Sequence, residues 1–211
     1  MRLAGIAGAV AFTWLLLAGC SGGLKSNLPI AQVYLLRPSW LAPAASLPAS
    51  AAPGTGSVQV TLPQAAAGLS SDSIVVLRPG ERLDYYGAAR WAAAAPAMLQ
   101  TLAIDALRAS KRFSMVESDA GPFASDYLLS LELRHFEAEY TGAGPPTVHV
   151  ALVCTLGRRT DRDVIVSFGA ESSVTADADR MQSVVAAFER ATGDALSQLA
   201  ANVPLPGPVQ P

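Results

Sequence analysis

The sequence predicts an α+β sandwich, in which a mixed, largely antiparallel sheet carries two helices packed on one face. Several segments alternate apolar and polar residues with the two-residue period of strands. Two longer segments, 97–110 and 179–201, instead carry their apolar residues as one stripe at helical spacing. Because each helix buries a single stripe, both are expected on the same face of the sheet. The other face is then left to solvent or to a partner.

The chain begins with a segment typical of exported proteins. Residues 3–18 are apolar or small and carry no charge, and the run is shorter than the roughly 20 residues that span a bilayer as a helix. It closes as Leu17-Ala18-Gly19-Cys20, which resembles the bacterial lipobox, where the chain is cut before a cysteine that receives a diacylglyceryl group. We therefore predict a lipoprotein signal peptide at 1–19 and lipidation of Cys20. The alternatives are an unmodified thiol in an ordinary signal peptide, or a short membrane helix.

The rest of the chain has the length and composition of one globular domain. The net charge is −2, without the basic stripe that a nucleic-acid partner requires. A polybasic membrane patch is also missing, so attachment to the membrane would come from the lipid. We expect a lipidated tether at 20–29, a domain at 30–202 and a disordered tail at 203–211. Within the domain, the Ala/Pro-rich segment 41–57 is expected to be a flexible loop.

The first part of the domain is expected to hold five strands and one helix. Pro96 suits the first turn of the helix at 97–110, and Lys111-Arg112 suits the negative end of its dipole. A turn at Pro79-Gly80 joins two of the strands as a hairpin. The predicted strands are 30–36, 57–62, 74–77, 82–86 and 113–116.

The second part is expected to be an antiparallel meander followed by the helix at 179–201. Apolar residues occupy odd positions up to Leu133 and even positions from Phe136 onward. Because successive side chains of a strand point to opposite faces, this slip requires a bulge or bend, which we place near Arg134-His135. The three strands of the meander are 127–140, 147–156 and 164–170.

Few residues of the domain offer catalytic or metal-binding chemistry. His135 and His149 have no second ligand at the spacing of a zinc site. The domain also lacks a Gly-x-Ser-x-Gly nucleophile turn and a phosphate-binding glycine loop. The clustered carboxylates Glu132, Glu137 and Glu139 are expected on solvated strand faces. We therefore predict no catalytic residue, no metal and no cofactor.

Cys154 is expected to be a buried structural residue. It lies in the alternating segment 147–156, where cysteine behaves as a small hydrophobic residue. The alternative, a reactive thiol, needs an exposed electropositive setting that nothing in the neighbouring sequence suggests. With Cys20 assigned to lipid, no disulfide is predicted.

A group of large side chains precedes the first helix. Tyr85, Tyr86, Arg90 and Trp91 are expected to crowd a turn, and Tyr, Trp and Arg are the residue types enriched at interface hot spots. They are therefore candidate partner-binding residues. The alternative is that they pack at the sheet edge under the helix, with Arg90 paired to an acid. Both interpretations stay open, and one residue could serve both roles.

Several segments resemble the ABC-type transport auxiliary lipoproteins, in the order in which that family has them. The most specific is 82–92, which contains the tyrosine–tryptophan motif just described. The resemblance covers residues 15–202, although the loop at 41–57 is longer and richer in Ala and Pro than expected. The other similar segments are 34–36, 99–110, 112–113, 126–129, 136–140 and 184–188.

This resemblance implies a non-catalytic lipoprotein on the periplasmic face of the outer membrane. Its family acts beside an ATPase, a permease and an MCE-domain protein that move lipids between membranes. Ser21 fits outer-membrane sorting, since Asp at that position typically retains a lipoprotein in the inner membrane. The implied partners are the MCE-domain protein and the membrane that holds the lipid anchor, and a homo-oligomeric ring is a further arrangement.

Two other function classes stay open at this point. One is a periplasmic lipid- or solute-binding lipoprotein, which needs a concave apolar pocket, although the chain is too short for two lobes. The other is a lipoprotein hydrolase, which would lose activity on substitution of a single Ser or His.

Overall fold

The computed structural model describes residues 31–39 and 54–204. The predicted signal peptide, Cys20, the tether, most of the 41–57 loop and the tail beyond Pro204 lie outside these residues. The elements are β1 (Gln32–Tyr34), β2 (Ser57–Val60), β3 (Gln64–Ala65), the short 3-10 helix η2 (Ala67–Leu69), β4 (Ser73–Arg78), β5 (Arg82–Trp91), α2 (Ala95–Ser110), β6 (Met115–Ser118), β7 (Tyr127–Glu139), β8 (Thr147–Arg158), β9 (Val164–Thr175) and α3 (Met181–Asn202).

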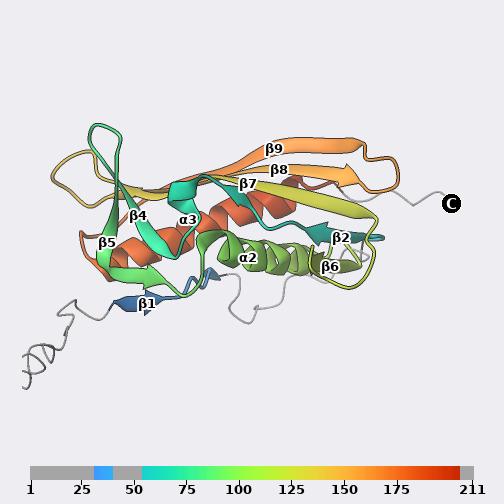
Figure 1. Cartoon of the computed structure of the whole chain (residues 1–211), viewed down its shortest axis with the longest axis horizontal. Helices are drawn as coiled ribbons and strands as arrows, with labels where there is room; N and C mark the ends of the chain where they lie inside the picture. The colour runs from blue at the N-terminus through green and yellow to red at the C-terminus, as the bar shows by residue number, and fades with distance from the viewer. Residues whose placement is uncertain (1–30, 40–53, 205–211) are drawn as a thin grey trace, which may run out of the picture. The chain divides into compact units, whose positions relative to one another are not determined.

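The sheet is built on β7, a strand of 13 residues (Figure 1). One edge of β7 pairs with the antiparallel β8 along its whole length. The other edge pairs in turn with three short parallel strands, β2, β3 and β4. β9 extends the sheet beyond β8, while β5 and then β1 extend it beyond β4, and β6 beyond β2. The predicted mixed sheet and its antiparallel meander, β7-β8-β9, are confirmed.

The predicted bulge in β7 is also confirmed. The register with β8 shifts between Leu133 and His135, so that Leu133 and Phe136 both point to the buried face. Without the extra residue, one half of the strand would turn its apolar side chains to solvent. The bulge therefore lets one long strand serve a single core.

Both long helices lie on one face of the sheet, as predicted (Figure 1). α3 packs on β8 and β9, α2 packs on β2 and β6, and the helices contact each other. Their apolar stripes are buried, as Leu107 of α2 and Leu196 of α3 illustrate. α2 ends at Lys111, whose φ of 54° closes the helix in the left-handed region. Within residues 31–39 and 54–204, no helix is long and apolar enough to cross a membrane.

An aromatic cluster fills the core between the sheet and α3. The Trp91 ring lies 5.7 Å from the Phe136 ring and 5.1 Å from that of Phe188, measured between centroids. Phe136 and Phe188 are 5.0 Å apart. All three side chains are at most 1% exposed. Because they come from β5, β7 and α3, the cluster joins elements that are far apart in the sequence.

Some elements differ from the sequence predictions. β5 continues to Trp91 instead of stopping at residue 86, because its end pairs with β1. β9 runs to Thr175, through polar residues that carry no apolar strand signal. β6 lies two residues later than predicted, and β3 has only two residues and was missed.

The ends of two predicted flexible segments are bound to the domain. The backbone N–H of Gly54 donates to the carbonyl of Lys111 at 2.9 Å, at the end of the predicted loop. Val203, placed by the sequence in the tail, is fully buried, and its carbonyl accepts a 2.7 Å hydrogen bond from Arg112 Nη1. The core therefore reaches slightly further along the chain than the apolar pattern indicates.

Trp91→Ala should lower the free energy of unfolding by about 3–5 kcal/mol, because it leaves a cavity between two aromatic rings. Urea unfolding followed by circular dichroism measures this loss. Tyr85→Ala is the matched control, because Tyr85 lies on the same strand and is 45% exposed. A Trp91→Ala protein as stable as the control would contradict the packing described here.

Cys154 should resist alkylation in the folded protein. The prediction of a buried residue is confirmed, and burial raises the pKa of its thiol to about 12, so little of the reactive thiolate exists at pH 8.5. Iodoacetamide at pH 8.5 should label Cys154 in urea but not in buffer, as measured by peptide mass spectrometry. Rapid labelling of the folded protein would show that the thiol is accessible.

Candidate functional site

The four residues of the tyrosine–tryptophan motif lie on β5, not on a turn before the helix as the sequence predicts. Their environments differ. Tyr85 is 45% exposed and the Arg90 side chain is 55% exposed, whereas Trp91 is buried in the aromatic core. Tyr86 is partly buried against the core. Tyr85 and Arg90 are therefore accessible to a partner. Trp91 instead packs in the core, which is the second of the two interpretations of the sequence.

Tyr86 joins three elements through its hydroxyl. Tyr140, one residue beyond β7, donates a 2.6 Å hydrogen bond to Oδ1 of Asp179, which precedes α3. Because this bond uses the single hydroxyl proton of Tyr140, Tyr86 is the donor in the 2.9 Å hydrogen bond between the two tyrosines. Burial and the bond to Asp179 raise the pKa of Tyr140. The Arg78 guanidinium lies 5.2 Å from the centroid of the Tyr140 ring, a cation–π contact.

Arg90 forms the acid pair that one sequence interpretation expected. Its Nη1 atom lies 3.7 Å from Oδ2 of Asp72, and both side chains are about half exposed. Exposed ion pairs of this kind contribute at most about 1 kcal/mol to stability. The pair therefore orients Arg90, and the half-exposed Arg90 side chain stays accessible to a partner.

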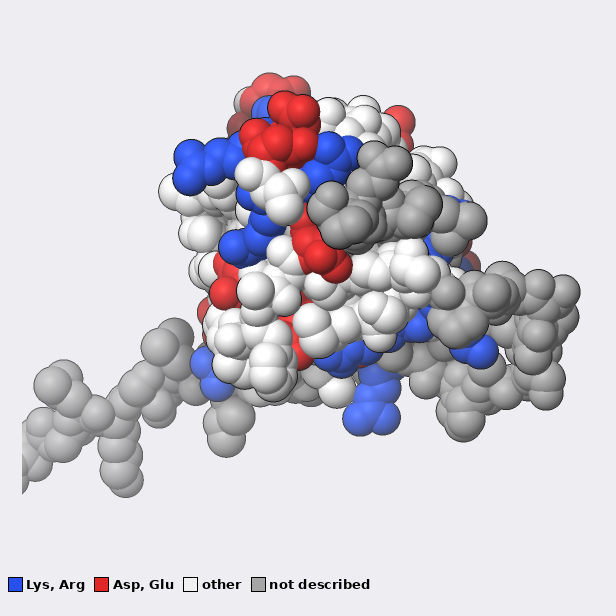
Figure 2. Space-filling view, turned by 90° about the vertical axis from the view of Figure 1, so that its right-hand side faces the viewer, with Lys and Arg blue, Asp and Glu red and all other residues white. Residues whose placement is uncertain are grey.

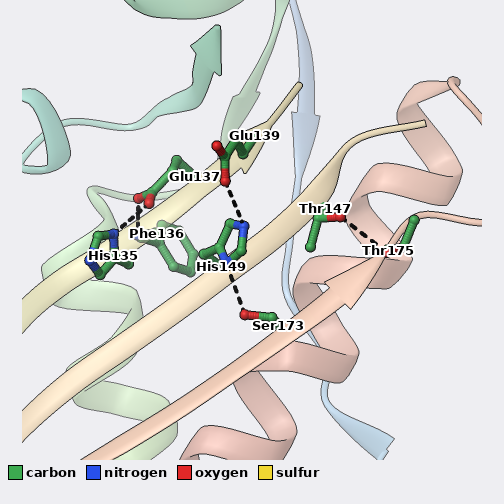
Figure 3. Close-up of polar contacts among 8 residues, drawn as sticks. All are labelled: His135, Phe136, Glu137, Glu139, Thr147, His149, Ser173 and Thr175. Carbon is green, nitrogen blue, oxygen red and sulfur yellow. Dashed lines mark hydrogen bonds and ion pairs between the residues drawn. The ribbon is translucent and has the colours of Figure 1, made fainter. Parts of the chain in front are cut away.

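A second cluster lies on the helix-free face of the sheet, around the β7 bulge (Figure 3). His135 Nδ1 lies 2.6 Å from Glu137 Oε1, and the Phe136 N–H donates to Glu137 Oε2 at 2.6 Å. Glu137 lies on the helix-free face but is only 7% exposed, so the expectation that its carboxylate is solvated is wrong. The bulge explains the difference, because it folds His135 over the carboxylate and gives it a backbone donor.

His149 bridges the three strands of the meander (Figure 3). Its Nε2 atom lies 3.0 Å from Glu139 Oε2 on β7, and its Nδ1 atom lies 2.8 Å from Ser173 Oγ on β9. Because a carboxylate accepts and a hydroxyl can donate, the neutral ring fits with its proton on Nε2. His135, His149 and the carboxylates of Glu137, Glu139 and Glu171 line one hollow of about 460 Å³.

The order Ser173, His149, Glu139 is that of a hydrolase triad, but the arrangement lacks a second requirement. Acyl transfer needs hydrogen-bond donors aimed at the developing oxyanion. The backbone N–H groups of β8 and β9 lie in the plane of the sheet, so they do not point to the face that carries these side chains. Within the described residues, the two strands that carry Ser173 and His149 therefore offer no backbone donor to an oxyanion on this face. In the part of the chain that the structure describes, no group of three His, Cys, Asp or Glu side chains could hold a metal ion.

The sequence contained part of the signal for this cluster. The parity slip located the bulge, and His149 lies at a position of β8 that faces away from the core. The contact between His149 and Ser173 depends on the β8–β9 register, which pairs these two residues. That register could not be read from the single-strand patterns.

Comparison with known proteins agrees with the fold described above. The family model of the ABC-type transport auxiliary lipoprotein component matches residues 34–201. A crystal structure from Xanthomonas campestris, assigned to family DUF330, is 25% identical, with 80% of this chain and 92% of that chain covered and a TM-score of 0.69. The crystal structure of an uncharacterised protein, 12% identical, covers 83% of this chain and 99% of its own, with a TM-score of 0.64. Comparison with curated proteins gave no match.

The family match spans both helices and the strands from β2 to β9. It includes the β5 motif and the helix-free face with the His149 cluster. Since it covers well over half of the sequence, the chain belongs to the family of the ABC-type transport auxiliary lipoprotein component.

Proposed function

We propose that this protein is the outer-membrane lipoprotein of an MCE-type ABC system for lipid transport between membranes, and that it docks the lipid conduit at the outer membrane. The observation that carries the proposal is the family match over 34–201, joined to the lipobox that ends at Cys20. The family is one of transport auxiliary lipoproteins rather than enzymes. The protein then works by holding partners in place.

The proposed anchor is the lipidated Cys20, after removal of residues 1–19. A tri-acylated cysteine carries several times the CH₂ groups of one myristoyl chain, at about 0.8 kcal/mol for each buried group, so attachment is effectively permanent. Ser21 in the following position supports sorting to the outer membrane. The tether at 20–29 reaches at most ~35 Å when extended, which keeps the domain near the periplasmic face of that membrane.

The proposed partner surface is the exposed side of β5. Leu83 and Tyr85 are each 45% exposed on the hairpin that β5 forms with β4, and Arg90 follows on the same strand. Exposed Tyr and Arg side chains are suited to hot spots because they combine contact area with directed hydrogen bonds. The hydrogen bonds from Tyr86 to Tyr140 and from Tyr140 to Asp179 connect the hairpin to the end of β7 and the start of α3. These contacts fix the conformation of the proposed surface. A homo-oligomeric ring would use such a surface equally well.

Capture from mild detergent extracts tests the proposed partner. The lipidated protein carrying a C-terminal affinity tag should retain an MCE-domain protein, identified by mass spectrometry. Repeated extraction that recovers no MCE-domain protein would contradict the proposal.

Cys20→Ser should leave the protein unlipidated and release it from the membrane fraction. Intact-mass measurement and sucrose-gradient fractionation report the two effects. Cys154→Ser is the matched control, because it also removes one thiol, and it should keep the acylated mass. A Cys20→Ser protein with unchanged mass and membrane location would exclude the lipobox interpretation.

Tyr85→Ala combined with Arg90→Ala should reduce capture of the partner by about ten-fold, as expected for two hot-spot residues. The free energy of unfolding should change by about 1 kcal/mol or less, because neither side chain is in the core. Phe123→Ala combined with Arg134→Ala is the matched control, since it also removes one exposed aromatic and one exposed arginine. Equal capture by the two double variants would rule out this surface.

A further inference from the structure

A second hollow on the helix-free face lies at the other end of the meander, beside the β8–β9 turn. Its volume is about 540 Å³. It is lined by Leu128 and Ser130 of β7 and by Thr155 of β8. Three arginines from the end of β8 and the turn line it as well, Arg158, Arg159 and Arg162. None of its lining residues is acidic. Figure 2 looks onto this end of the molecule, where charged side chains gather.

The three guanidinium groups are not equally available. Arg158 is paired with Asp161 at 2.5 Å, within the turn. Arg159 donates from Nη2 to Oε1 of Gln59, a neutral acceptor that leaves its charge uncompensated. Arg162 has no ion pair or side-chain hydrogen bond with any residue in 31–39 or 54–204. Among the residues that the structure describes, two of the three arginines that line the hollow therefore have no carboxylate partner.

Arg159 is held in place by buried groups. Gln59 is 5% exposed and is fixed by its own Nε2 donor, which bonds to the carbonyl of Phe123 at 2.9 Å. The backbone N–H of Arg159 donates to the carbonyl of Asp126 at 2.9 Å. Arg162 occupies the turn with a φ of 62°, a left-handed conformation that non-glycine residues rarely adopt. The turn thus sets the position of the backbone that carries both arginines.

We propose that this hollow binds a phosphate ester. Guanidinium groups match the tetrahedral oxygens of phosphate with paired N–H donors, and the Ser130 hydroxyl adds a neutral donor. The Thr155 hydroxyl, which also lines the hollow, shares a 3.0 Å hydrogen bond with Ser167. Leu128, which also lines the hollow, offers apolar contact to the group that the phosphate esterifies. The phosphate can come from an anionic lipid headgroup or from a small soluble ester. The site rests on these contacts alone and stands independently of the proposed docking role.

The test uses the full-length lipidated protein in neutral detergent micelles. Isothermal titration calorimetry is run with glycerol phosphate, and separately with phosphatidylglycerol added to the micelles. Phosphatidylcholine and polyglutamate are the comparison ligands. Arg159→Gln with Arg162→Gln removes the two uncompensated charges. Arg82→Gln with Arg134→Gln removes two exposed arginines elsewhere and is the matched control.

The wild-type protein should bind at least one of the two phosphate probes, and the Arg159/Arg162 variant should bind it about ten-fold more weakly or worse. The control variant should stay within about two-fold of wild type. Binding of both probes would show that a soluble phosphate ester is sufficient for binding. Binding of phosphatidylglycerol alone would show that the site requires the phosphate of a lipid headgroup. Either result supports the site.

Three results would overturn the proposal. The first is that wild type binds neither phosphate probe. The second is that both double variants weaken binding equally, which would show a response to net charge instead of a site. The third is tighter binding of polyglutamate than of either phosphate, which would indicate an acidic protein partner.

Discussion

The bulge in β7 lets the longest strand of the sheet keep its apolar side chains on one buried face. β7 pairs with β8 along its whole length and with β2, β3 and β4 along parts of its other edge, and its apolar side chains lie on the helix-covered face from Tyr127 to Ala138. The two-residue period of its apolar side chains breaks between Leu133 and Phe136, and the bulge restores it. Phe136 can then join Trp91 and Phe188 in the aromatic cluster that ties α3 to the sheet. The same irregularity buries Glu137 under His135 on the opposite face.

The two faces of the meander consequently carry different chemistry. The helix-covered face is apolar and is buried under the helices. The other face has the His149 cluster at one end and the arginine-lined hollow at the other, with no helix over either in the described part of the chain. Together with the exposed β5 hairpin, these surfaces suit a protein that acts through contacts. A lipid anchor at Cys20 would fix the molecule at a membrane and leave such surfaces available.

Much of this fold could be predicted from local patterns. The apolar stripes located both helices, and the parity slip located the bulge. What was missed depends on tertiary pairing. The end of β5 is a strand because Gln32–Tyr34 pairs with Ala89–Trp91 and Ser73 pairs with Arg90. The small residues at 87–89 carry no strand signal of their own. Which of the four motif residues are buried depends on which face of the sheet meets α3. The residue types alone could therefore not predict that Trp91 is buried and Tyr85 is exposed.

In the proposed role, the β5 surface contacts an MCE-domain protein in the cell envelope. Site-specific photo-crosslinking in living cells tests this contact, with a photoreactive amino acid at position 85 and a comparison probe at the exposed position 123. We expect a covalent adduct with an MCE-domain protein from position 85 and none from position 123. Adducts from position 85 that contain only other proteins would rule out the proposed contact.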